Sequence, residues 1–188
     1  MIRIGLLSDT HGYLDPRVFH FFADVDEIWH AGDFGSLEVS EHLAKFRPLK
    51  GVYGNIDGPE IRHTHPLDQR FECGGLDVWM THIGGHPGRY DRRVRPLLDQ
   101  RPPDLFICGH SHILRVERDK KRNLLHLNPG AAGNQGFHVM KTMMLLTIAE
   151  GRVQRLQAVE LGQRGQRSPQ ELMDSHDENL SEDYDNAP

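Results

Sequence analysis

The sequence of 188 residues predicts an α/β domain in which two β-sheets pack together. Two observations predict this fold class. Up to residue 112, short apolar runs alternate with helix-like stretches, which is typical of an α/β layered sheet. Beyond that residue the apolar runs come in pairs joined by polar turns, which indicates antiparallel hairpins. An early α/β part followed by antiparallel strands fits two packed sheets.

Five apolar runs in the first part are expected to form buried strands, because each is short and is followed by turn or polar residues. These runs are 2–7, 27–31, 49–53, 76–80 and 104–108. The helix-like stretches between them are 16–23, 36–46 and 91–98. Ser36 suits the N-cap of the second helix, and Pro48 lies just beyond its end.

The chain after residue 112 predicts two hairpins. Runs 113–117 and 124–127 flank the polar sequence Asp-Lys-Lys-Arg-Asn. Runs 142–148 and 153–159 flank a Glu-Gly turn. Polar or Gly-containing turns between apolar runs are the hairpin signal, so we expect each pair to be antiparallel.

The negative charge of the chain is concentrated at its C-terminus. The chain has 22 Lys and Arg against 27 Asp and Glu, a formal net charge of −5. Segment 163–188 holds two Arg and seven acidic residues, which leaves 20 basic and 20 acidic residues in 1–162. We therefore expect one domain over 1–162 and a disordered acidic tail over 163–188, with an acidic interaction arm as the alternative for the tail.

Composition also limits the compartment and the partners. The neutral body does not have the basic balance of a protein that grips nucleic acid, so stable nucleic-acid binding is not expected. The apolar runs are far shorter than the roughly 20 residues that span a bilayer, and the N-terminus enters a strand without the pattern of a signal peptide. Two cysteines, Cys73 and Cys108, cannot form a multi-bridge framework, so we expect a reducing, cytoplasmic location.

Side chains that can bind a metal follow all five of these predicted strands. In open α/β sheets, functional groups collect at the carboxyl ends of the strands, so these side chains should converge on one rim. The set comprises two carboxylates, one amide oxygen and four imidazoles: Asp9, His11, Asp33, Asn55, His82, His110 and His112.

Each part of this pattern is weak alone. About one Asp-x-His is expected by chance in a chain this rich in Asp and His, and a lone Gly-Asp or Gly-Asn is more often a turn. A single histidine such as His82 after an apolar strand is more often structural than a ligand. The conjunction is more specific, because a purely structural explanation must account separately for five consecutive strands that end in metal-binding chemistry.

Seven ligands exceed the needs of one ion, and they suit two divalent ions that share a bridging carboxylate. Two such ions and two aspartates leave a charge of roughly +2, which suits an anionic, phosphate-like substrate. The ions would also lower the pKa of a bridging water, so that hydroxide could attack phosphorus in line. A passive cation store is the alternative, although it does not need a site open to solvent.

These motifs resemble those of calcineurin-like metallophosphoesterases. Asp9-x-His11, Gly32-Asp33, Gly54-Asn55, Thr81-His82 and Gly109-His110-Ser111-His112 occur in the order seen in that superfamily. The length of the chain without a cap domain resembles the small YfcE-like phosphodiesterase family, as does Asn128-Pro129-Gly130. The resemblance covers about residues 1–160.

The resemblance implies a four-layer α/β/β/α sandwich of two mixed β-sheets flanked by helices, and a dinuclear metal-dependent phosphodiesterase that acts on small phosphate esters. It implies one metal held by Asp9, His11, Asp33 and His112. A second metal would be held by Asp33, Asn55, His82 and His110, with Asp33 as the bridge. Mixed N and O ligation leaves the metal open, with Mn²⁺ as the first candidate and Fe, Ni, Zn or Mg as alternatives. Asp33, Asn55 and His82 are also the expected catalytic residues.

The sequence departs from the family pattern at one position. Many members carry a His directly after the Asn of the third motif, where it can protonate the leaving group, but this chain has Ile56. A side chain without a proton cannot act as a general acid. His86, four residues after His82, is the candidate we assign to this catalytic role, against the alternative of a solvated loop histidine.

Other residues near these motifs leave alternatives open. Arg89 is the candidate substrate-binding residue of a basic cluster that otherwise fits a solvated helix face, and Asn55 is expected to bind substrate as well. Asp57 is interpreted as a turn former rather than a ligand. Asn128 could support a ligand by a hydrogen bond or cap the Asn-Pro-Gly turn.

Three functions are consistent with the fold. A metal-dependent phosphodiesterase or phosphatase is favoured because all seven ligands are present. A scaffold is the alternative, since a eukaryotic retromer subunit has a similar fold and acts by binding proteins. A nuclease is disfavoured by the neutral body and by the lack of a basic stripe with aromatics. Self-association into a homo-oligomer is left open.

Overall fold

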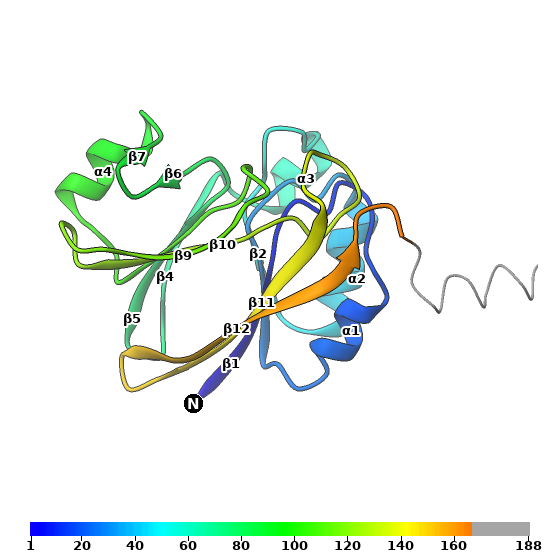
Figure 1. Ribbon diagram of the computed structural model, residues 1–188, viewed down its shortest axis with the longest axis horizontal. Helices are drawn as coiled ribbons and strands as arrows, with labels where there is room; N and C mark the ends of the chain where they lie inside the picture. Colours follow the sequence, from blue (N-terminus) through cyan, green and yellow to red (C-terminus); the bar gives the residue numbers. More distant parts are fainter. Residues whose placement is uncertain (167–188) are drawn as a thin grey trace, which may run out of the picture.

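The computed structural model describes residues 1–166, which form two five-stranded mixed β-sheets packed face to face (Figure 1). The first sheet has the spatial order β12 (Arg152–Gln163), β11 (Met140–Ala149), β1 (Ile2–Leu7), β2 (Glu27–His30) and β3 (Leu49–Gly51). The second has the order β4 (Asp68–Cys73), β5 (Leu76–Thr81), β8 (Leu105–Ile107), β10 (Leu124–Pro129) and β9 (Leu114–Asp119). Strands β1, β2 and β3 are parallel in the first sheet, and β5, β8 and β10 are parallel in the second. The other neighbouring pairs are antiparallel.

Helices cover the outer faces of both sheets. The helices are α1 (Arg17–Phe21), α2 (Leu37–Phe46), α3 (Pro59–Thr64) and α4 (Val94–Gln100). The first three lie against the first sheet, and α4 lies on the outer side of the second sheet beside a short hairpin of β6 (Gly85–His86) and β7 (Arg89–Tyr90) (Figure 1). The Ser36 hydroxyl accepts a hydrogen bond from the Val39 N–H and caps α2, as predicted.

Apolar side chains fill three separate layers. Leu6, Trp29 and Met80 belong to the cluster between the two sheets. Leu7 and Ile28, each adjacent in the chain to one of those residues, point to the opposite face and pack with the helices of the first sheet, because side chains alternate along a strand. A third cluster joins α4 to the outer face of the second sheet. The fold is therefore a four-layer α/β/β/α sandwich, which confirms the expected fold class.

The predicted strands are all present, and both predicted hairpins are antiparallel pairs. The structure divides the five early strands between the sheets, with β1, β2 and β3 in the first and β5 and β8 in the second. Strand β4 was not predicted, because its sequence is mostly polar and it lies at an edge, where its side chains are largely half-buried. Helix α3 was also missed, and α4 begins at Val94, three residues after its predicted start.

A buried ion pair ties β11 to the segment before α1. The Lys141 Nζ atom lies 2.8 Å from Asp15 Oδ2, and both side chains are fully buried. The Arg17 guanidinium donates to both oxygens of the same carboxylate, at 2.9 and 2.7 Å. Burial alone raises the pKa of Asp15, but Arg17 and Lys141 outweigh it and hold this pKa at about 2. The carboxylate is therefore ionised at neutral pH.

Strand β12 ends at Gln163, and most of the predicted tail, from residue 167 onward, lies outside the described residues. The division into a domain over 1–162 and a tail over 163–188 stays a prediction. None of the helices described over 1–166 combines the length and the apolar content that crossing a membrane requires.

Candidate metal centre

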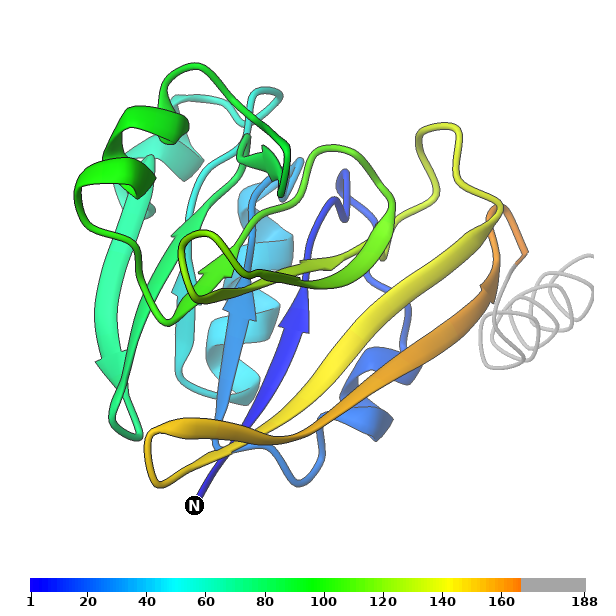
Figure 2. The ribbon, with the colours of Figure 1, turned by 60° about the vertical axis from the view of Figure 1, so that its left-hand side comes forward.

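The seven predicted ligands lie in loops that follow the carboxyl ends of parallel strands. Asp9 and His11 follow β1, Asp33 follows β2, and Asn55 follows β3, all in the first sheet. The remaining ligands come from the second sheet, where His82 follows β5 and two more histidines follow β8. Figure 2 shows β1 and β2 running in the same direction toward the edge where loops of both sheets meet. Two sheets, rather than one, thus supply the rim.

Six of these side chains form two groups that could each hold a metal ion. Asp9, His11 and His112 make up one group, and Asp33, His82 and His110 make up the other. Within each group, one ligand atom from every residue lies within 4.8 Å of the others. The shortest contacts are His112 Nε2 to Asp9 Oδ1 at 3.1 Å and His82 Nε2 to Asp33 Oδ2 at 3.2 Å.

The two groups adjoin at Asp33. Its Oδ2 atom lies 3.2 Å from His82 Nε2 in its own group and 3.8 Å from His11 Nε2 in the other. Its second oxygen, Oδ1, accepts a hydrogen bond of 3.1 Å from the Ile56 backbone N–H. This bond holds the carboxylate, and its Oδ2 atom faces one histidine of each group.

Hydrogen bonds fix the tautomer of His82. Its Nδ1–H donates to the Ala31 carbonyl at 2.8 Å, so in the neutral ring the Nε2 lone pair faces Asp33. Within the described part of the chain, His82 Nε2 and Asp9 Oδ1 are buried without a hydrogen-bond partner. Buried polar atoms without partners are costly, and a cation between these electron pairs would satisfy both. The residues therefore fit a metal.

His112 is oriented in the same way by a residue that the sequence did not reveal. His138 donates from Nε2–H to the Gly133 carbonyl at 3.0 Å, which leaves its Nδ1 as an acceptor. The two Nδ1 atoms of His138 and His112 are 3.2 Å apart, so His112 donates this bond and presents its Nε2 lone pair to Asp9. No sequence signal marks His138, because it lies in a loop far from the strand-end motifs.

Backbone strain is concentrated at the ligands. Five of them have left-handed backbone conformations: Asp9 (φ 55°), His11 (φ 50°), Asp33 (φ 57°), His110 (φ 66°) and His112 (φ 57°). Among the described residues, only Asn123 and Glu150, both in hairpin turns, share this conformation without being Gly. Such conformations cost of the order of 1 kcal/mol each and collect at functional sites, where the surrounding structure enforces them.

Glycines before two of the ligands leave space for the ligand side chains. A Cβ on Gly54 would overlap the carboxylate and backbone N of Asp33. A Cβ on Gly109 would overlap the Ser8 hydroxyl and lie 2.7 Å from Asp9 Oδ2. The Gly-Asn and Gly-His pairs of the sequence thus reflect the close approach of loops from different strands.

The electrostatics of the cluster favour the ionised form of the Asp33 carboxylate. Burial raises the pKa of Asp33, but the contacts with His82, the Ile56 N–H and His11 outweigh it and lower this pKa. Burial opposes the charged form of His82, yet the carboxylates of Asp33 and Asp9 outweigh it and raise its pKa. Burial and the neighbouring His82 lower the pKa of His110. Asp33 is therefore ionised at neutral pH and available to a cation.

The remaining predicted residues line two hollows that adjoin the centre. Asn55 is exposed and lines, with His82, a hollow of about 270 Å³. His86 and Arg89 line another, of about 840 Å³, together with His110. His86 donates from Nδ1–H to the Pro87 carbonyl at 2.9 Å, which leaves its Nε2 atom unoccupied by that bond.

Two residues with open interpretations support the loops. The buried Asp57 carboxylate accepts the N–H groups of Gly54 at 2.7 Å and Gly35 at 2.8 Å, so it forms the turn as predicted and joins two ligand-bearing loops. The Asn128 amide donates to the Gly109 carbonyl at 2.8 Å, while its oxygen accepts the Gly130 N–H at 2.9 Å. Asn128 therefore both supports the loop of His110 and caps its own turn.

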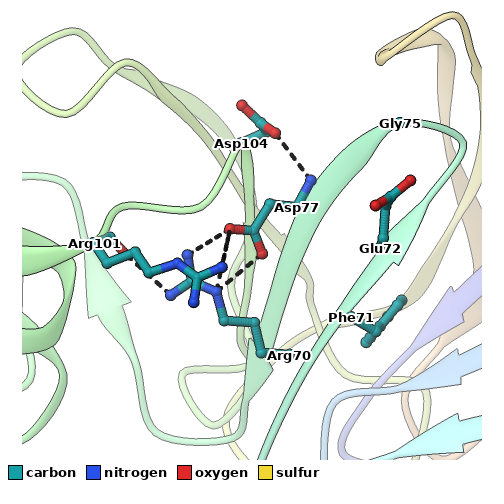
Figure 3. A pocket seen from close by; sticks show the side chains of 7 residues that line it. All are labelled: Arg70, Phe71, Glu72, Gly75, Asp77, Arg101 and Asp104. Atoms are coloured by element: carbon teal, nitrogen blue, oxygen red, sulfur yellow. Dashed lines mark hydrogen bonds and ion pairs between the residues drawn. The ribbon is translucent and has the colours of Figure 1, made fainter.

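A further hollow, of about 440 Å³, lies at the opposite ends of β5 and β8, where these strands begin (Figure 3). Figure 3 shows Arg70 and Arg101 converging on Asp77. The Nη2 atom of Arg70 lies 2.6 Å from Asp77 Oδ2, and that of Arg101 lies 3.6 Å from it. Asp104 accepts the Asp77 N–H at 2.9 Å. These charged groups pair with one another, so this hollow is interpreted as a structural feature rather than a ligand site.

Comparisons with known proteins place the chain in a family. A model of the calcineurin-like phosphoesterase superfamily domain matches residues 2–151. A probable metallophosphoesterase of Methanothermobacter thermautotrophicus is 31% identical over 133 residues, covering 68% of this chain and 76% of the relative. A phosphodiesterase of Methanocaldococcus jannaschii is 28% identical over 145 residues, covering 69% and 83%.

Solved structures share the fold. An archaeal phosphodiesterase superposes with a TM-score of 0.67 at 24% identity, covering 85% of this chain and all of its own. Vps29 of Entamoeba histolytica, solved in complex with Zn²⁺, superposes with a TM-score of 0.62 at 19% identity, covering 85% and 99%. Because the family model matches most of the length of this chain, the chain belongs to the calcineurin-like phosphoesterase superfamily.

Proposed function

We propose that the protein is a phosphodiesterase that uses two divalent metal ions. The observation that carries this proposal is the pair of adjoining ligand groups, in which fixed lone pairs and two unpartnered buried atoms face a shared space. A relative named as a phosphodiesterase supports the same reaction class. The substrate is a small phosphate ester, because the adjoining hollows have the volume of small-ligand sites.

The residues would divide between the ions as follows. Asp9, His11 and His112 would hold one ion, and Asp33, His82 and His110 would hold the other, with Asn55 as its further ligand and Asp33 shared by both. When bound, two divalent ions supply positive charge for a phosphate and lower the pKa of water that they bind. Nitrogen and oxygen ligands suit Mn²⁺, Fe, Ni or Zn, and Mn²⁺ remains our first candidate.

Hydrogen bonds within the protein hold the candidate ligands in place. The Ile56 N–H holds Asp33, while Ala31 and His138 hold the rings of His82 and His112, so the ligands need little rearrangement when the site is loaded. The Ile56 side chain has no proton to give to a leaving group. His86 lines the hollow beside His110 and is the proposed proton donor, through its Nε2 atom.

Metal loading and turnover test this function together. We expect the purified protein to bind about two ions per chain and to hydrolyse bis(p-nitrophenyl) phosphate only when Mn²⁺ or a similar ion is present. Asp33→Ala should lose turnover, because the shared carboxylate serves both groups. Equal hydrolysis with and without a chelator, or full activity of Asp33→Ala, would contradict the proposal.

A non-catalytic scaffold is the second candidate. One observation favours it: Phe137 and Val139 are 104% and 74% exposed on the loop that carries His138, and exposed apolar side chains suit a partner surface. The likeness to Vps29 proteins is below 20% identity and shows the fold alone. A scaffold needs no turnover, so a metal-loaded protein that binds two ions and hydrolyses none of a panel of phosphodiesters would favour it.

A further inference from the structure

The hollow beside His110 carries more positive charge than one scissile phosphate needs. Its volume is about 840 Å³, large enough for a whole nucleotide-sized molecule. Three arginines, Arg89, Arg92 and Arg115, and one carboxylate, that of Asp91, line it, so the positive groups outnumber the negative one. The domain body is neutral overall, with 20 basic and 20 acidic residues over 1–162, so this is a local concentration of charge.

Two of these arginines are available to a ligand. Arg115 lies 2.8 Å from Glu117 and is partly neutralised. Over the described residues, Arg89 and Arg92 form no ion pair with a carboxylate. Neighbouring arginines differ, since Arg93 pairs with Asp68 and Arg122 with Asp119, at 2.6 and 2.8 Å. An exposed arginine is often only solvated, but unpaired arginines at a hollow beside a candidate metal centre indicate an anionic ligand group.

The wall that carries Arg89 is anchored. Arg89 and Tyr90 form β7, which pairs with β6. The Tyr90 hydroxyl donates to Asp119 at 3.0 Å, and the Arg122 guanidinium lies 4.9 Å from the centre of the Tyr90 ring. The hairpin is therefore fastened to the β9–β10 turn, and Arg89 is presented from a supported element rather than from a free loop.

The positive charge continues past this wall. A second hollow, of about 460 Å³, shares Arg89 and Tyr90 with the first. It is also lined by Arg95, by Lys121 and by the Asp119–Arg122 ion pair, whose charges offset each other. Cationic side chains therefore extend from the neighbourhood of His110 across the β6–β7 hairpin. Such an arrangement suits a substrate with anionic groups at two points, one at the metal centre and one further out.

We propose that the natural substrate carries a second phosphate, which Arg89 and Arg92 bind while the scissile phosphoester lies at the metal centre. This inference rests on the proposed phosphodiesterase function and specifies the substrate class. Arg89 and Arg92 thus act as specificity-determining residues, because they discriminate between esters of equal intrinsic reactivity. The discrimination weakens as ionic strength rises, since both arginines are exposed.

A matched pair of esters tests the proposal. Thymidine 5′-(p-nitrophenyl phosphate) and its 3′-phosphorylated form release the same nitrophenolate and differ only in the second phosphate. With the Mn²⁺-loaded protein, we expect kcat/KM to be about tenfold higher for the 3′-phosphorylated ester, mostly through a lower KM. In the Arg89→Gln/Arg92→Gln variant this ratio should fall to near one. Arg152→Gln, an exposed control at the start of β12, should keep the wild-type ratio.

A wild-type ratio near one, or a high ratio that survives in the double variant, overturns the inference. Equilibrium binding decides the matter without turnover. Thymidine 3′,5′-bisphosphate should bind the Mn²⁺-loaded protein about tenfold more tightly than thymidine 5′-monophosphate, and the double variant should lose this difference. Equal binding of the two nucleotides by the wild type refutes the second-phosphate site. If neither ester is cleaved but the bisphosphate preference is present and depends on both arginines, the phosphodiesterase proposal fails while the binding inference stands.

Discussion

Replacing His138 with Ala removes the acceptor that holds His112 in its Nδ1–H form. His138 Nδ1 lies 3.2 Å from His112 Nδ1, and His112 Nε2 then faces Asp9 at 3.1 Å. Loss of such a supporting hydrogen bond typically weakens metal binding 10–100-fold, which is about 1.4–2.8 kcal/mol. We therefore expect one of two bound Mn²⁺ ions to weaken by this factor, while the ion at Asp33, His82 and His110 keeps its affinity.

Calorimetric titration of metal-free protein with Mn²⁺ measures this change. His42→Ala removes a similarly sized but exposed histidine on α2 and should leave both affinities unchanged. His138→Ala also removes the hydrogen bond to the Gly133 carbonyl, so we expect a loss of about 1 kcal/mol in the free energy of unfolding of the metal-free protein. Unchanged affinity for both ions in a folded His138→Ala protein would refute the orienting role.

Two further predictions concern stability and the ligand loops. The pKa of Asp15 falls from 3.8 to about 2 on folding, so the ionised carboxylate adds about 2 kcal/mol to the free energy of unfolding above pH 4. This contribution is lost as the pH falls through 2. Urea unfolding at pH 5 and pH 2.5 should show the loss, and Asp15→Asn should reduce the difference between the two pH values. Gly109→Ala should weaken binding of the ion held by Asp9, His11 and His112 at least about tenfold, because the added methyl group displaces Asp9. Gly58→Ala is the control, since its methyl group meets the flexible Glu60 side chain, and equal titration curves for the two variants would argue against the crowding.

The early strands and the positions of the candidate ligands at the strand ends could be predicted because each signal is local. Strand β1 is a mainly apolar run that ends at Leu7, and the polar residues Ser8 and Asp9 follow it. Strand β4 gave no such signal, because an edge strand can keep polar side chains that pair with neighbours, as Asp68 does with Arg93 and with the Trp79 N–H.

The parts of the site that could not be predicted depend on contacts between distant segments. His138 has its role only through His112, 26 residues away, and nothing in its own neighbourhood indicates this contact. The division of the ligand-bearing strands between two sheets also could not be predicted, because it depends on pairing between distant strands. The large hollow exists because the β6–β7 hairpin folds beside the loop of His110, and this packing turns Arg89 from a surface residue into a lining residue.

Anomalous diffraction from crystals of the Mn²⁺-loaded protein tests most directly whether these loops hold a pair of cations. We predict two anomalous peaks per chain, about 3.5–4 Å apart. One should lie among Asp9, His11 and His112, the other among Asp33, His82 and His110, and the Asp33 carboxylate should contact both. A single peak, or peaks that these side chains do not contact, would contradict the account.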